Sequence, residues 1–330
     1  MFQFVYHNIA QVFKAAFSLT KSAEETVAII GALENDYHGV FEKSAIKKAA
    51  RFQGVQQVFI NDPFANLMGR DTNHFERTSN KYYFILTGLY DDIIDQKLIS
   101  EKELDQLFND PINANAAIFE TKLLVDIHLN LLKRVKNITE YKATLSKVHQ
   151  AQKDSLKQFD QNTSKEEILD ITLRKGGYSL LMCRHYIDLP VSNELNEAWY
   201  LLGGIIQLTN DLYDIHKDLQ EGICTLPNSI KNIDDIELLY KMYKNLVTKF
   251  FQGLSNLPFD QHKIKTLKIK LSAIPAFGFL AIKNLWKINN QYKGLPNLKT
   301  IPRKDLIIDM EKPINRLKLI QEAYKVYKTN

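Results

Sequence analysis

Residues that force a turn are scarce in this chain: 13 glycines and 9 prolines are spread over 330 residues. Because Gly and Pro supply many of the backbone conformations that tight turns need, few turns are obligatory here. The long stretches between them are rich in Leu, Ile, Lys, Glu and Ala, with Phe and Tyr added. That composition favours helices over a many-stranded β fold, so the sequence predicts an all-α protein.

Apolar residues that recur at helical spacing indicate where the helices lie. We expect helices at 3–35 (one or two), 42–60, 75–95, within 96–109, and at 113–135, 138–160, 165–188, 193–220, 233–253, 260–290 and 312–327. Proline ends or bends a helix, so we expect Asn61-Asp62-Pro63 to stop the second helix and Pro275 to bend the tenth. Without a repeat or a Pro/Ser-rich linker, these helices predict one large helical bundle and a single domain over residues 1–330.

Composition excludes several other classes of protein. Hydrophobic residues make up 45% of the chain, which argues against disorder, and the net charge of +5 is spread along it. No basic block marks a nucleic-acid partner, and no apolar run is long enough to be an integral membrane segment. The two cysteines, Cys183 and Cys224, have no metal-ligand spacing. We expect free thiols, no signal peptide and a cytoplasmic protein.

Three aspartates gather at the end of the predicted helix 75–95. Asp91 and Asp95 are four residues apart, so their carboxylates lie on one face, one turn apart, with Asp92 beside them. Carboxylates at this spacing repel one another, and the helix dipole disfavours negative charge near a helix C-terminus. A cation that neutralises them explains the cluster, and Mg²⁺ suits hard carboxylate oxygens together with substrate phosphates.

A second polar cluster follows an apolar segment more than a hundred residues later. Asn210, Asp214 and Asp218 are spaced at i, i+4 and i+8, which places them on one strip of the predicted helix 193–220. An amide oxygen and two carboxylates form a second set of oxygen ligands, and Lys217 is next to them for a phosphate. Two acidic strips at the ends of apolar helices can face one another across a helical bundle.

At these two clusters the sequence resembles the class I isoprenoid (terpene) synthases. Asp91-Asp92-Ile93-Ile94-Asp95 resembles their DDxxD motif. The run Asn210–Asp218 resembles the NSE motif of terpene cyclases, with Asp214 where Ser or Thr is usual and Asp218 in place of Glu.

The second stretch, continued through Gly222 to Leu226-Pro227, is also similar to the squalene and phytoene synthases. Those enzymes have a Glu where this chain has Lys217, and usually an Arg just before the first motif, where this chain has Leu86–Tyr90. Chain-elongating synthases usually have an Arg pair after the first motif, and here Gln96–Ser100 follows. These departures favour a cyclase, a carbon–oxygen lyase, over an elongating prenyltransferase.

The resemblance implies a Mg²⁺-dependent enzyme, with three magnesium ions, that ionises a linear prenyl diphosphate and releases pyrophosphate. The metal ligands that it implies are Asp91, Asp92, Asp95, Asn210, Asp214 and Asp218, and all of these except Asp92 are also the expected catalytic residues. Lys217, Arg174 and Lys175 are the candidates for binding the diphosphate. The aromatic candidates for the wall that shields the allylic cation are Tyr83, Phe84, Tyr90 and Tyr178. Helical enzymes of this group are often homodimers.

Three alternatives stay open. The chain can be a head-to-head synthase of the squalene or phytoene type, or a trans-prenyl diphosphate synthase. It can also be a catalytically inactive helical binding protein. The paired Gly176-Gly177 in the predicted helix 165–188 has two readings as well: a helix break that turns a carbonyl toward the cation, or close packing against another helix.

Overall fold

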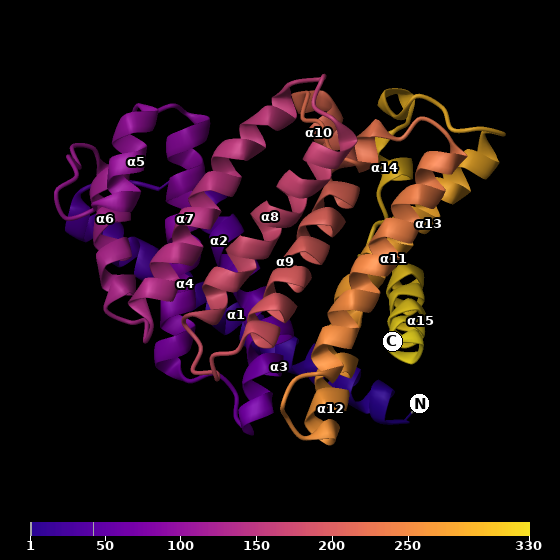
Figure 1. Cartoon of the computed structure of the whole chain (residues 1–330), viewed down its shortest axis with the longest axis horizontal. Helices are drawn as coiled ribbons and strands as arrows, with labels where there is room; N and C mark the ends of the chain where they lie inside the picture. Colours follow the sequence, from indigo (N-terminus) through magenta and orange to yellow (C-terminus); the bar gives the residue numbers. More distant parts are fainter. Residues whose placement is uncertain (1, 42) are drawn as a thin grey trace. The chain divides into compact units, whose positions relative to one another are not determined.

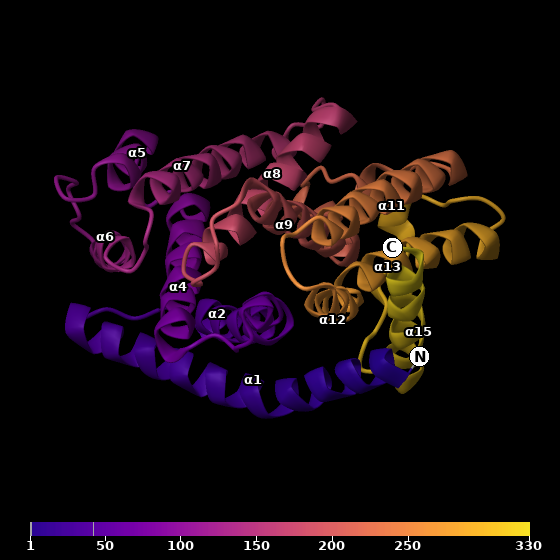
Figure 2. The same ribbon diagram turned by 60° about the horizontal axis from the view of Figure 1, so that its bottom comes forward.

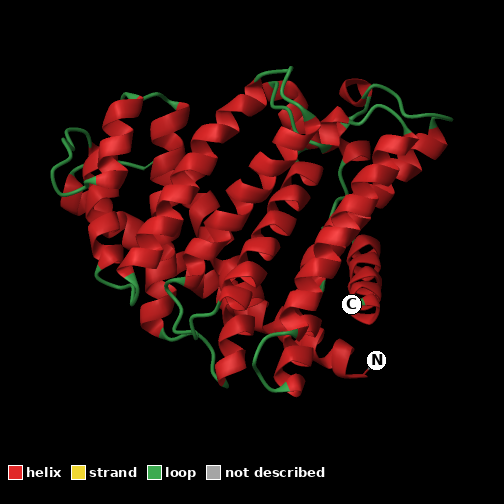
Figure 3. Ribbon diagram, viewed as in Figure 1, coloured by secondary structure: helices red, strands yellow, loops and turns green. Residues whose placement is uncertain are grey.

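The structure is a computed structural model that describes residues 2–41 and 43–330. Within these ranges every regular element is a helix and no strand occurs (Figure 3). The prediction of an all-α fold is therefore confirmed. None of the described helices is long and apolar enough to cross a bilayer.

The chain divides into two compact units, and the helices α7 and α8 contribute residues to both. The prediction of a single domain over residues 1–330 stays a prediction. The first unit comprises Met1–Ser146 and Met182–Pro190, and the second comprises Lys147–Leu181 and Val191–Asn330. Figure 1 labels the helices in chain order.

The first unit is built around α4. Its elements are α1 (Phe2–Tyr37), α2 (Lys43–Gln56), a π-helical turn (Gln57–Asn61), α3 (Asp62–Ala65), a 3₁₀ turn (Asn66–Met68), α4 (His74–Asp95), α5 (Glu101–Asn109), α6 (Phe119–Leu132) and the first part of α7 (Ile138–Ser155). Helix α1 lies along α2, while α2 and α6 pack against α4 (Figure 2). Tyr83, Leu86, Leu89 and Ile93 of α4 are buried, as their helical spacing predicts.

The second unit is built around α9. Its elements are a 3₁₀ turn (Leu156–Phe159), α8 (Lys165–Arg184, most of which lies in this unit), α9 (Asn193–Tyr213), α10 (Ile215–Glu221), a 3₁₀ turn (Pro227–Ser229), α11 (Ile233–Ser255), α12 (Gln261–Leu271), α13 (Ala273–Gln291), a 3₁₀ turn (Leu298–Thr300), α14 (Arg303–Leu306) and α15 (Pro313–Thr329). Helix α9 packs against α11 and α13, and α13 packs against α15. The core between them holds Trp199, Tyr243, Phe250 and Leu285, each with no exposed surface.

Helices α8 and α9 approach closely where two pairs of glycines meet. A Cβ atom added to Gly176 would lie 2.3 Å from the carbonyl oxygen of Gly203, and one added to Gly203 would lie 2.2 Å from the carbonyl oxygen of Gly176. Helix α8 continues unbroken through Gly176 and Gly177. The structure therefore decides between the two readings of Gly176-Gly177: the pair allows close helix packing and makes no helix break.

One of the two predictions made from prolines is wrong. The chain remains helical past Asn61, because Pro63 lies in the first turn of α3, where its missing N–H is not needed. The predicted interruption of helix 260–290 near Pro275 is present: α12 ends at Leu271, and the single residue Ser272 joins it to α13. Pro275 has no N–H to donate to the carbonyl of Leu271, which explains why the helix is interrupted there.

The predicted helix 193–220 is also interrupted. Helix α9 ends at Tyr213 and α10 begins at Ile215. The residue between them, Asp214, has φ −95° and ψ 5°, in a sparsely populated backbone region where active-site residues are often found. The break therefore falls within the second polar cluster.

Candidate active site

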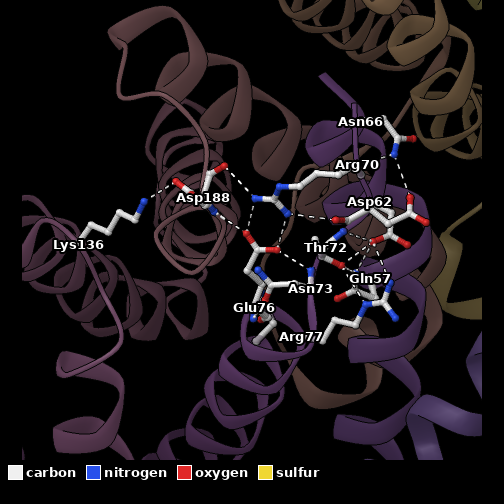
Figure 4. Close-up of polar contacts among 12 residues, drawn as sticks. Gln57, Asp62, Asn66, Arg70, Thr72, Asn73, Glu76, Arg77, Lys136 and Asp188 are labelled. Carbon is white, nitrogen blue, oxygen red and sulfur yellow. Dashed lines mark hydrogen bonds and ion pairs between the residues drawn. The ribbon is translucent and has the colours of Figure 1, made fainter. Parts of the chain in front are cut away.

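The aspartates of the first cluster stand on a helix whose opposite end is firmly anchored. Figure 4 shows the polar network at the start of α4. The buried carboxylate of Asp62 accepts hydrogen bonds from the backbone N–H of Thr72 at 3.1 Å and from its hydroxyl at 2.6 Å. Gln57 donates to the same carboxylate at 2.7 Å, and the ammonium group of Lys14 lies 2.7 Å from it. A buried carboxylate with this many donors fixes the loop that leads into α4.

A second carboxylate anchors the first turn of α4. Glu76 and Asn73 form a capping box, in which each side chain accepts a hydrogen bond from the other residue's backbone N–H. Arg70 donates to both carboxylate oxygens of Glu76, at 2.7 and 2.8 Å. The backbone N–H of Asp188 donates to Glu76 at 2.7 Å, which ties α4 to the segment after α8 within the same unit (Figure 4).

The first aspartate cluster lies at the C-terminal end of α4, as predicted. Asp91 and Asp92 are half-buried, and α4 ends at Asp95, whose side chain lies outside what the structure describes. Tyr90, next to Asp91, is buried, and both its burial and the Asp91 carboxylate raise the pKa of its hydroxyl. The hydroxyl of Tyr90 is therefore a neutral hydrogen-bond donor at physiological pH.

A run of aromatic rings lies behind this cluster. Successive ring centres are between 4.7 and 6.4 Å apart, in tilted or edge-to-face arrangements. The rings are, in order, those of Tyr90, Phe108, His128, Tyr141, Tyr186 and Tyr83. Only Tyr83 and Tyr90 of these six were predicted from the sequence. The other four rings come from α5, α6, α7 and the turn that follows α8, so no local pattern joins them to α4.

His128 is a neutral member of this aromatic run. Burial, together with the charge of Lys142, lowers the pKa of its imidazole to about 4. Within the described residues, neither ring nitrogen of His128 has a hydrogen-bond partner. The hydroxyl groups of Tyr141 and Tyr186, by contrast, lie 3.0 Å apart and pair with each other. The wall is therefore mostly apolar, with its polar atoms paired or uncharged.

The second cluster lies at the junction of α9 and α10. Backbone hydrogen bonds of 2.8 Å run from the N–H of Asp214 to the carbonyl of Asn210, and from the N–H of Asp218 to the carbonyl of Asp214. The three residues therefore stay one helical turn apart in spite of the break. Asn210 and Asp214 are exposed, whereas Asp218 is buried. The break thus separates the predicted strip into an exposed part and a buried part.

Two carboxylates of this cluster are buried, and one of them, Asp211, was not predicted. Asp211 accepts hydrogen bonds from Gln207 at 2.9 Å and from Thr172 of α8 at 3.2 Å. Burial raises the pKa of Asp211 to about 6. Burial, together with the charges of Asp211 and Asp214, raises the pKa of Asp218 to about 7. Among the described residues, neither Asp211 nor Asp218 has an ion-pair partner, so this corner concentrates negative charge that a cation would relieve.

The three cationic candidates differ in what surrounds them. The half-buried Lys175 carries the positive charge that acts most directly on Asp211. Arg174 instead donates to Asp154 and Asp170, each at 2.7 Å. Lys217 is exposed on α10, and its ammonium group lies 3.7 Å from the carboxylate of Glu221. Of the three, Lys175 acts on Asp211 and Lys217 acts on Asp218, whereas the charge of Arg174 is taken up by its two ion pairs.

The two remaining aromatic candidates lie apart from the aromatic run. The ring of Tyr178 lies tilted against that of Tyr200, with the ring centres 4.9 Å apart. The ammonium group of Lys147 lies 5.4 Å from the centre of the Tyr178 ring. Phe84 is half-buried and packs edge-to-face against Tyr83 at 6.0 Å. Tyr178 belongs to the second unit and Phe84 to the first.

The acidic clusters lie in different units, α4 in the first and the α9–α10 junction in the second. Among the described side chains, no three Asp, Glu, His or Cys residues converge closely enough to hold a metal ion by themselves. The prediction that the two clusters face one another stays a prediction, and so do the metal and catalytic roles of their residues. The donors are aspartate and asparagine oxygens, with the oxygens of Thr172 and Gln207 beside them, which is the donor type that Mg²⁺ prefers.

Asp211 is a residue of the site that helical spacing did not predict. It lies one position after Asn210, so it falls outside the i, i+4, i+8 strip. The only signal in the sequence is Gln207, four residues earlier, a polar residue at the end of the apolar stretch of α9. That signal does not distinguish a structural amide from one that holds a carboxylate.

No family model matches this chain, and no curated protein matches it closely enough to be called a relative. Among solved structures, the crystal structure of a dehydrosqualene synthase in complex with a ligand is similar, with 14% sequence identity and a TM-score of 0.47. The similarity covers 87% of this chain and 99% of that one. A likeness at this level does not assign the chain to a family, so the case for a function rests on the chain's own residues.

Proposed function

We propose that this protein is a Mg²⁺-dependent terpene synthase that ionises a linear prenyl diphosphate and releases pyrophosphate. The observation that carries the proposal is the corner around Asp211, at the end of the apolar helix α9, and Asp218 of α10. Both carboxylates are buried, and neither has an ion-pair partner in the part of the chain that the structure describes. A chain that keeps such a charge buried needs a cation or a proton there. The sequence of the surrounding stretch, Asn210 to Asp218, and the order of the two motifs point to the magnesium site of a class I isoprenoid synthase.

Each cluster has a defined part in this proposal. Asn210, Asp214 and Asp218 would hold magnesium on the α9–α10 side, and Asp91, Asp92 and Asp95 would hold it on the α4 side. Magnesium, when bound, neutralises the diphosphate as it leaves. Lys175 adds a positive charge for the diphosphate oxygens, while Asp154 and Asp170 already occupy Arg174.

The aromatic run behind Asp91 suits the second requirement of this chemistry. An allylic cation must be kept from water and stabilised by surroundings that carry no competing positive charge. Ring faces such as those of Tyr83 and Tyr90 attract positive charge, and the neutral imidazole of His128 adds no competing charge. We therefore propose that these rings line the wall of the prenyl pocket.

The experiment that tests the function is incubation of the purified protein with geranyl, farnesyl, geranylgeranyl and longer diphosphates, with and without Mg²⁺. We expect a Mg²⁺-dependent hydrocarbon or alcohol with the carbon number of the substrate, identified by mass spectrometry. Asp91→Asn and Asn210→Ala should each lower kcat by at least about 100-fold. Glu237→Gln, which changes an exposed carboxylate of α11 that belongs to neither cluster, is the matched control and should keep full activity.

A second candidate function has its own observation. The stretch from Thr209 through Asp214, Asp218 and Gly222 to Leu226-Pro227 is similar to the squalene and phytoene synthases. A product of doubled carbon number would establish such a head-to-head synthase in place of the terpene synthase.

The non-enzymatic alternative is separated from both by a binding measurement. A working site should bind Mg²⁺ and pyrophosphate together, and this raises the melting temperature of the folded chain by mass action. Absence of any turnover, together with no shift in melting temperature, would contradict the enzymatic proposal.

A further inference from the structure

The basic charge of this molecule is concentrated on two helices of the second unit. Helices α12 and α15 together carry eight Lys and Arg residues and one acidic residue, Glu322, a net charge of +7. The whole chain carries +5, so all other residues together are slightly acidic. The two helices are in contact with each other near the end of α15 (Figure 1).

Helix α15 is apolar on two faces, and one of them is exposed. Ala323 and Val326 are buried where α15 packs on α13. On the opposite side, Ile314, Leu317 and Ile320 are 56%, 51% and 49% exposed. At 100° per residue, these three side chains fall within a sector of about 120° that lies away from the buried face. A soluble helix normally has only one apolar stripe, so the second one calls for a partner.

Basic residues flank this exposed stripe on both sides. Arg316 lies about 40° beyond Ile320 on the helical wheel, and Lys318 lies about 40° beyond Ile314. Both are exposed. An apolar stripe with a basic residue on either side is the pattern of helices that lie in the interface of an anionic bilayer.

The stripe leads into a cavity lined by lysines. Lys328 follows Ile314 by fourteen residues, four helical turns, so it lies on nearly the same line along α15. It lines a cavity of about 320 Å³ together with Lys265 and Lys268 of α12. Among the described residues, none of the side chains that line this cavity is acidic. Burial lowers the pKa of the Lys268 ammonium group, which donates to the main-chain oxygen of Asn330 at 2.8 Å, so Lys265 and Lys328 are the lysines of the cavity best placed to meet an added anion.

We propose that the α12–α15 face docks on an anionic lipid surface, with Ile314, Leu317 and Ile320 entering the interface and the lysines of the cavity meeting lipid phosphates. Charge complementarity argues for this occupant: a stripe buried in a second copy of this chain would bring two surfaces of the same strong positive charge together. Each lysine near an anionic surface strengthens the attachment, and apolar insertion makes it last beyond simple electrostatic contact. The inference is independent of the proposed catalytic function.

The test is co-sedimentation of the full chain with vesicles of phosphatidylcholine, with and without phosphatidylglycerol. We expect binding to the anionic vesicles only, and weaker binding at high salt. Leu317→Asn combined with Ile320→Asn should abolish sedimentation, while Lys265→Gln and Lys328→Gln should each weaken it about fivefold. All variants should keep the melting temperature of the parent protein, because these side chains are exposed or line an open cavity.

Two matched controls lie on α11 in the same unit. Leu238 is 64% exposed but is near Asp234 and Glu237, and Lys241 is exposed one turn away. Leu238→Asn and Lys241→Gln should therefore leave vesicle binding unchanged. Absence of binding to anionic vesicles, or equal binding to neutral ones, would overturn the proposal. So would a dimer in solution that the Leu317/Ile320 variant converts to a monomer, because the stripe would then be an interface between copies.

Discussion

The carboxylate of Asp218 lowers the stability of the folded chain, although the proposed activity requires it. This carboxylate is buried beside Asp211 and Asp214, which raises its pKa to about 7. A neutral side chain of the same shape removes the repulsion but also removes a proposed metal ligand. We expect Asp218→Asn to lower turnover at least about 100-fold. Its stability without metal should stay the same or rise by about 1 kcal/mol.

Thermal unfolding and turnover, measured on the same preparations, check this prediction. Asp154→Asn is the contrasting variant, because Asp154 forms an ion pair with Arg174 at 2.7 Å and both side chains are largely buried. It should lose about 1 kcal/mol of stability, since the Arg174 charge loses one of its two partners. A large loss of stability in Asp218→Asn would mean that the carboxylate has a structural partner and no need of a cation.

Among the helices, the crossing of α8 and α9 depends most on single residues. A methyl group at Gly203 would meet the backbone of Gly176 and Gly177 on α8, which has no flexible side chain to move aside. We expect Gly203→Ala to lower the free energy of unfolding by about 3 kcal/mol, at the upper end of ordinary overpacking. Urea unfolding measures this.

Gly253 of α11 is the control for the glycine prediction. A Cβ atom added there meets no atom within 4 Å. Gly253→Ala should therefore stabilise the protein by about 0.5 kcal/mol or more, because alanine favours the helix. If both variants were equally stable, the close approach of α8 and α9 would be wrong.

For the molecule as a whole, the buried histidines contribute to how stability depends on pH, and Asp211 and Asp218, whose pKa values are raised, contribute in the opposite direction over the same range. Burial, together with the charges of Lys142 and Arg184 respectively, lowers the pKa values of His128 and His185 to about 4. The unfolded chain binds these protons near pH 6.5, whereas the folded chain binds them only near pH 4. The stabilising effect is therefore complete above pH 6.5 and is lost as the pH falls from 6.5 to 4.

Chemical unfolding measured between pH 8 and pH 4 checks this. His128 alone should contribute on the order of 3 kcal/mol across that range, and His185 adds to it. The unfolding free energy of the parent minus that of His128→Leu isolates this histidine from the opposing contributions of Asp211 and Asp218 and should decrease as the pH falls. A difference that does not change with pH would show that His128 is not the group responsible.

The local pattern of the chain was enough to predict its helices and the places of its two acidic clusters. The apolar spacing of Tyr83, Leu86 and Leu89 acts over a few residues, so it can be read from the sequence. The same holds for Asp91 and Asp92 at the end of α4. The stop predicted at Asn61 and the unbroken helix predicted through Asp214 were wrong, because a proline or a cap has the same local signal whether a helix ends there or a new one begins.

Burial and partnership were decided by the tertiary structure alone. Spacing placed Asn210, Asp214 and Asp218 together, but only the tertiary structure shows that Thr172 of α8 holds Asp211 and that Asp218 is buried. Arg174 and Lys175 are neighbours of equal charge in the sequence, and their different surroundings separate an ion-paired residue from one directed at the cluster. The aromatic run from Tyr90 to Tyr83 combines residues a hundred positions apart. Such contacts cannot be read from the sequence, because their residues are far apart along the chain. The stability of a buried charge or ring depends on the groups that surround it in space.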